Sequence, residues 1–91
     1  MFVLTIQGKE MEGTYSVSNI NGEHVLYLFQ EEDDALRYAM MLEEDEYPTM
    51  TVLEVDDNII IKACEFSSTK YALITSNDIV VPPKTPFYDN V

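Results

Sequence analysis

His24 and Cys64 are the side chains in this sequence that could most readily catalyse a reaction, as a proton acceptor and as a nucleophile. A catalytic histidine needs an oriented partner within hydrogen-bond reach, and a reactive cysteine needs a positive group that favours its thiolate. His24 follows a predicted turn at the edge of a strand, and Cys64 lies among apolar residues with Glu65 beside it. We therefore predict no catalytic residue and a protein that is not an enzyme.

Metal and nucleotide sites also lack their usual residues. A zinc site needs about four nitrogen or sulfur ligands, whereas the chain has one histidine and one cysteine. The acidic clusters lack the spaced Asp-x-Asp-x-Asp-Gly loop of calcium sites. Gly8, Gly13 and Gly22 are too scattered to form a phosphate-binding loop. The prediction is that the protein holds no metal and no cofactor.

Residues 31–46 contain eight acidic side chains and one basic side chain, Arg37. Acids at the start of a helix are favourable, but those at residues 43–46 would oppose the helix dipole, at a cost of roughly 0.3 kcal/mol or more each. Solubility alone could explain such a surface, and the functional alternative is a face that attracts a basic partner surface. The residues assigned to this partner-binding face are Glu32, Asp33, Asp34, Glu43, Glu44, Glu46 and, as a possible aromatic anchor, Tyr47.

The leading hypothesis is therefore a non-enzymatic, acidic protein–protein interaction or regulatory module that binds a basic protein surface. A first alternative is a nucleic-acid mimic that inhibits a DNA- or RNA-binding protein. A second alternative is a small-ligand-binding domain or enzyme whose site is assembled from residues that sequence order hides.

Composition restricts the partners and the compartment. The chain has 91 residues, enough for one domain, and a net charge of −12, which repels nucleic acid and anionic membranes. It shows no membrane span and no signal peptide, and a single cysteine fits a reducing interior such as the cytoplasm. We expect no direct nucleic-acid or membrane binding; an exposed sheet edge could pair with a second copy, so a homodimer is possible.

The first half of the chain predicts three strands and a helix. Strands are expected at residues 2–6, at residues 14–18 and, after an Asn21-Gly22 hairpin turn, at residues 24–29. The third strand is apolar on both faces, which is typical of the centre of a sheet. The main helix is predicted at residues 31–44. Its apolar stripe comprises Ala35, Tyr38, Ala39 and Leu42, widened by Leu36 and Met40.

The second half is less regular. Residues 50–55 read as a strand, expected to lie parallel to and beside the strand before the helix. Asp57-Asn58 could form a turn that makes residues 59–66 a hairpin strand, or residues 57–66 could form a short helix capped by Asp56 or Asp57. We predict an α+β domain over residues 1–80, with a mixed sheet of about four to five strands in the order β-β-β-α-β-α-β. The Pro-rich tail, residues 81–91, could dock on the domain, dock on another chain or stay mobile.

Several segments in order resemble a small family of uncharacterised cyanobacterial and chloroplast proteins, classed only as a domain of unknown function. They are Leu26-Tyr27-Leu28-Phe29, Glu32-Asp33-Asp34-Ala35-Leu36-Arg37-Tyr38-Ala39, Met41-Leu42-Glu43 and Tyr47-Pro48-Thr49. The similarity extends from the opening strand to about Cys64. It implies a compact α+β unit, a helix rather than a hairpin after Asp57, and a cyanobacterial, plastid or phage setting. It implies no activity, cofactor or catalytic residue.

Overall fold

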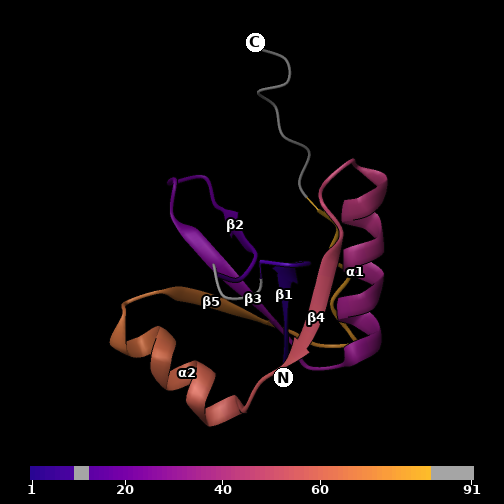
Figure 1. Cartoon of the computed structure of the whole chain (residues 1–91). Helices are drawn as coiled ribbons and strands as arrows, with labels where there is room; N and C mark the ends of the chain where they lie inside the picture. Colours follow the sequence, from indigo (N-terminus) through magenta and orange to yellow (C-terminus); the bar gives the residue numbers. More distant parts are fainter. Residues whose placement is uncertain (10–12, 83–91) are drawn as a thin grey trace.

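The structure is a computed structural model, and it describes residues 1–9 and 13–82. The elements follow the predicted order β-β-β-α-β-α-β (Figure 1). They are β1 (Phe2–Ile6), β2 (Ser16–Ser18), β3 (His24–Phe29), α1 (Glu32–Glu44), β4 (Met50–Glu54), α2 (Asp57–Phe66) and β5 (Lys70–Ile74).

The strands form one mixed sheet in which β3 has neighbours on both sides, which confirms the central position predicted for it. On one edge β3 pairs in parallel with β5, from Val25↔Lys70 to Phe29↔Ile74. On the other edge it pairs antiparallel with β2 and, at Phe2↔Phe29, with β1. β1 in turn pairs antiparallel with β4 over five residues.

One expectation about the sheet was wrong. β3 and β4 run parallel to each other, but they are not neighbours, because β1 lies between them and is antiparallel to both. The physical reason is the composition of β1, whose Val3, Leu4 and Thr5 are all buried. A strand that is apolar on both faces gains most from an inner position, and β1 takes it.

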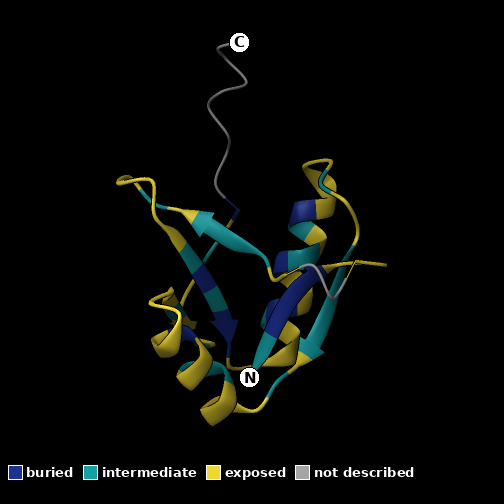
Figure 2. Cartoon of the chain, turned by 60° about the vertical axis from the view of Figure 1, so that its left-hand side comes forward, coloured by how far each residue is buried: buried dark blue, intermediate teal, exposed yellow. Residues whose placement is uncertain are grey.

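The two helices cover opposite faces of the sheet, so the domain has three layers. Side chains of α1 pack with one set of alternating strand residues, including Leu4 and Phe29. Side chains of α2 pack with the other set, including Val3 and Leu28. Because successive side chains of a strand point to opposite faces, each strand contributes to both apolar cores. Figure 2 shows the buried residues concentrated on the strands and on the inner side of α1.

Residues 57–66 are helical, so the hairpin alternative is wrong. The Asp56 carboxylate accepts a hydrogen bond from the backbone N–H of Ile59 at 3.1 Å, which caps the start of α2. Ile60, Ile61 and Cys64 then face the sheet at helical spacing. Local capping together with this spacing explains why three consecutive isoleucines form a helix here.

The core face of α1 is narrower than predicted. Ala35, Tyr38 and Leu42 are buried, as expected. Leu36 and Met40, which were expected to widen the buried stripe, are instead 45% and 62% exposed. They lie on the side of the helix away from the sheet, because α1 packs on a single sheet face and no other described element covers its outer side.

Most of the predicted tail, residues 83–91, lies outside the described residues. The apolar core between α1 and the sheet is called the α1-side core below. Residues 80–82 contact the domain, since Val80 packs against this core and Pro82 is buried.

Candidate functional site

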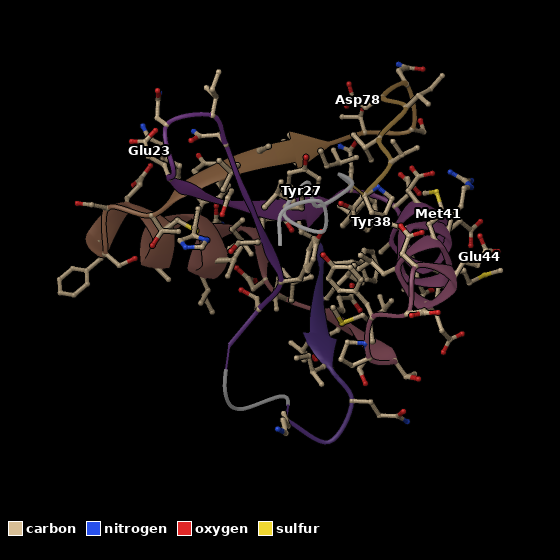
Figure 3. The ribbon with its side chains drawn as sticks, turned by 90° about the horizontal axis from the view of Figure 1, so that it is seen from above. Glu23, Tyr27, Tyr38, Met41, Glu44 and Asp78 are labelled. Atoms are coloured by element: carbon tan, nitrogen blue, oxygen red, sulfur yellow. The ribbon has the colours of Figure 1, made fainter. Side chains whose placement is uncertain are left out.

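The outer face of α1 carries an apolar centre with acids at both ends. Leu36 and Met40 are one helical turn apart and are exposed. Asp33 precedes this pair by three residues and Glu44 follows it by four, so the four side chains share one face of the helix. Figure 3 shows Glu44 on the outer side of α1 and Tyr38 on the side that faces the sheet. This surface is called the α1 outer face below.

A shallow groove runs between the α1 outer face and β4. Its volume is about 150 Å³, and its walls include both charged and apolar side chains. The lining residues are Leu36, Ala39, Met40, Glu43, Thr49 and Met50. The Thr49 hydroxyl donates a hydrogen bond to the Glu43 carboxylate at 2.9 Å. The Glu43 carboxylate is therefore held beside the apolar side chains of Leu36 and Met40. This geometry suits a partner that presents a cationic group next to an apolar one.

At the helix N-terminus the predicted acids fall into two types. Glu32 and Asp33 are exposed. Asp34 has a side chain only 13% exposed, and its Oδ1 accepts a hydrogen bond from the Arg37 guanidinium at 2.8 Å. Its Oδ2 is buried and has no hydrogen-bond partner within the described part of the chain. Asp34 therefore neutralises Arg37, the only base in α1, and leaves Glu32 and Asp33 as the acids that face solvent.

At the helix C-terminus, Glu44 and Glu46 are exposed and the last turn holds no base. Glu46 adopts the left-handed conformation, with φ of 68°, and the N–H of Tyr47 bonds to the carbonyl of Leu42 at 3.0 Å. This is the helix ending usually made with glycine. Tyr47, predicted as an aromatic anchor, is half-buried against the α1-side core. Part of its ring is therefore used by the fold.

The two groups of acids are not brought together. Glu32 and Glu44 lie twelve positions apart in one continuous helix, a distance of about 18 Å. The space between them is occupied by Leu36 and Met40, which were predicted as core residues and not as site residues. One signal could have revealed them: a buried stripe that includes both residues spans about 200° of the helix circumference, more than a helix packed on one face usually buries.

The two residues considered first for chemistry, His24 and Cys64, differ in exposure. His24 is exposed, and its Nδ1 lies 3.4 Å from the Ser16 hydroxyl. Cys64 is buried, and burial, together with the Glu65 carboxylate, raises the pKa of its thiol, which disfavours the thiolate. Within residues 1–9 and 13–82, no three His, Cys, Asp or Glu side chains are grouped so that they could hold a metal ion. None of the helices in these residues is both long and apolar enough to cross a membrane.

The fold and the α1 outer face together define a small three-layer α+β domain with an acidic, partly apolar helix surface. A family model described as a domain of unknown function, DUF3110, matches residues 1–84. The chain belongs to this family. No match was found among curated proteins or among solved structures.

Proposed function

We propose that this domain is a non-enzymatic protein–protein interaction or regulatory module whose α1 outer face binds a basic protein surface. Its proposed setting is a cyanobacterium, a plastid or a phage infecting such cells, as the sequence resemblance implies. Its proposed compartment is the cytoplasm, which the single cysteine favours. The observation that supports the proposal is the exposure of Leu36 and Met40 between two groups of solvent-facing acids on one helix.

Each part of the α1 outer face has a separate role in such binding. The acids give long-range attraction that raises the rate of encounter with a basic surface. Leu36 and Met40 supply the apolar contacts at the centre, where interfaces concentrate their binding energy, while charged residues form the rim. Methionine suits this position because its flexible side chain adapts to different partner shapes. The partner surface that fits is a pair of basic patches about 18 Å apart with an apolar contact between them.

The same arrangement favours this proposal over nucleic-acid mimicry. A mimic needs closely and regularly spaced negative charges, because a DNA strand carries one phosphate for about every 3.4 Å of helix axis. Here two uncharged side chains, Leu36 and Met40, separate the acids at the ends of α1. An apolar centre serves a protein partner and has no counterpart in the phosphate backbone.

A matched pair of charge variants tests the proposal. The triple variant Glu32→Gln, Glu43→Gln, Glu44→Gln removes three exposed carboxylates from α1, Glu44 on the α1 outer face and Glu32 and Glu43 beside it. The control Glu23→Gln, Glu54→Gln, Asp56→Asn removes the same number of charges from outside α1, and asparagine at position 56 can still cap α2. Immobilised wild-type domain is used to capture proteins from native cell extract, and both variants are tested against each captured protein. We expect a basic protein that the wild type and the control retain and the α1 variant releases.

Two further measurements on the captured basic protein distinguish long-range electrostatic attraction from apolar contact at the interface. The association rate with the wild type should fall steeply as salt rises, because exposed charges are screened over about 10 Å at 0.1 M ionic strength. Leu36→Ser with Met40→Ser should instead speed dissociation by roughly tenfold or more while leaving the salt dependence unchanged. The proposal is contradicted if the wild type and all variants capture the same proteins. It is also contradicted if the association rate does not change with salt concentration.

A further inference from the structure

The outer side of α2 carries exposed apolar side chains that the fold does not use. Phe66 is 94% exposed and Ile59 is 70% exposed. Ala63 is also exposed and lies between them, four residues after Ile59 and three before Phe66. This spacing places the three residues in one stripe, on the side of α2 opposite Cys64, which faces the sheet. The stripe Ile59, Ala63, Phe66 is called the α2 stripe below.

The surroundings of the α2 stripe are nearly neutral, although the chain carries a net charge of −12. Residues 57–74 contain two acids and two bases. Asp57 is paired with the N-terminal amine at 2.7 Å, and Lys70 lies 3.7 Å from Glu23. A second copy of this acidic chain is repelled by the acidic parts of the surface, and the balanced charges around the α2 stripe contribute little to that repulsion.

The two remaining charges of this segment make the surface self-complementary. Lys62 and Glu65 are both exposed and lie along the same flank of the α2 stripe. In an antiparallel pair of α2 helices related by a two-fold axis at Ala63, Lys62 of each copy lies within about 1.5 Å along the helix axis of Glu65 of the other. Ile59 of each copy then contacts Phe66 of the other. The small side chain of Ala63 allows the helices to approach closely.

We propose that the α2 stripe is a homodimer interface in which two copies pack their α2 helices antiparallel across a two-fold axis. The contact is small, because a ten-residue helix supplies much less area than the roughly 800 Å² per partner of standard interfaces. The dimer is therefore weak and forms reversibly with concentration. α1 lies on the opposite face of the sheet, so dimerisation leaves both α1 outer faces accessible. This inference does not depend on the proposed function.

Sedimentation velocity of the full chain over about three orders of magnitude in concentration tests the interface. We expect the wild type to shift from monomer to dimer. Phe66→Asp should raise the dimer dissociation constant by roughly tenfold or more, since it places a charge at an apolar contact. Ile20→Asp is the matched control, because Ile20 is 98% exposed in the loop between β2 and β3, and it should leave the dissociation constant unchanged. Circular dichroism confirms that both variants are folded.

A charge swap tests the antiparallel geometry. Lys62→Glu alone should weaken the dimer by roughly fivefold, because it creates a like-charge pair with Glu65 of the second copy. Lys62→Glu with Glu65→Lys should restore the wild-type dissociation constant within about twofold, because the opposite charges face each other again. A chain that stays monomeric throughout overturns the inference. So does a dimer that survives Phe66→Asp but is lost in Leu73→Asp, which would place the interface on β5.

Discussion

Tyr38 is the side chain on which the α1-side core depends. It is fully buried, and its ring centroid lies 5.6 Å from that of Tyr15, 5.7 Å from that of Tyr27 and 5.5 Å from that of Phe29. Its hydroxyl lies 3.1 Å from the Tyr15 hydroxyl. Figure 3 shows Tyr38 directed from α1 towards Tyr27. Burial, followed by the contact with Tyr15, raises the pKa of Tyr38 well above 10.0, and burial also raises the pKa of Tyr15.

These pKa values predict a loss of stability in alkali. The neutral phenols stabilise the fold fully below the unfolded pKa of 10.0, and the free energy of unfolding falls as pH rises above it, because only the unfolded chain then releases these protons. Urea denaturation from about pH 8 to about pH 11 measures the decline. Tyr38→Phe should cost about 1 kcal/mol at neutral pH and make the alkaline decline shallower.

Tyr71→Phe is the control for this experiment. Tyr71 is exposed on β5, so the variant should match the wild type at every pH. A Tyr38→Phe variant whose stability declines as steeply as the wild type would contradict the role assigned to the buried phenol.

At the scale of the element, the two ends of α1 are electrostatically unequal. Three acids in the first turn interact favourably with the helix dipole, whereas the last turn holds acids and no base. Glu46, in the left-handed conformation, adds backbone strain at the same end. The C-terminal acids therefore oppose helix stability, a cost that the proposed binding role of these residues would account for.

Replacing one of these acids should stabilise the domain and weaken binding. We expect Glu44→Lys to raise the free energy of unfolding by about 0.5 kcal/mol at low salt, because it places a cation at the C-terminus of α1. Glu44→Gln should give a smaller gain, and high salt should reduce both gains. Urea denaturation measures each effect. If Glu44→Lys left the free energy of unfolding unchanged or lowered it, the negative charge at the C-terminus of α1 would not be destabilising, and this prediction would be wrong.

At the scale of the whole molecule, a charge of −12 on 91 residues produces repulsion within the folded chain. We expect the midpoint of thermal unfolding to rise as sodium chloride increases from about 0.02 M to about 0.3 M, because screening weakens that repulsion. Differential scanning calorimetry measures the midpoint. The triple variant Glu32→Gln, Glu43→Gln, Glu44→Gln should show a smaller rise. A midpoint that falls with salt would mean that specific ion pairs outweigh the net repulsion.

The sequence by itself determined the approximate bounds of the elements, and their type everywhere except at residues 57–66, because these depend on signals a few residues apart. The Asn21-Gly22 turn, the acids at the start of α1 and the cap at Asp56 act on their immediate neighbours, and each marks a real boundary. The charge of the α1 outer face could also be predicted, since eight acids within residues 31–46 cannot all be buried. The choice between helix and hairpin at residues 57–66 could not be made from local residues alone, because both patterns were present.

Only the tertiary structure decided which apolar residues face solvent. Leu36 and Met40 on α1, and Ile59 and Phe66 on α2, have the composition of core residues and are exposed. Whether these side chains are buried depends on how many layers cover each helix. The layers are set by strand pairing between residues far apart in sequence, such as the insertion of β1 between β3 and β4. The hydrophobic effect favours burial of an apolar side chain but does not specify which partners bury it. The surroundings of such a side chain therefore follow from the packing of the whole chain.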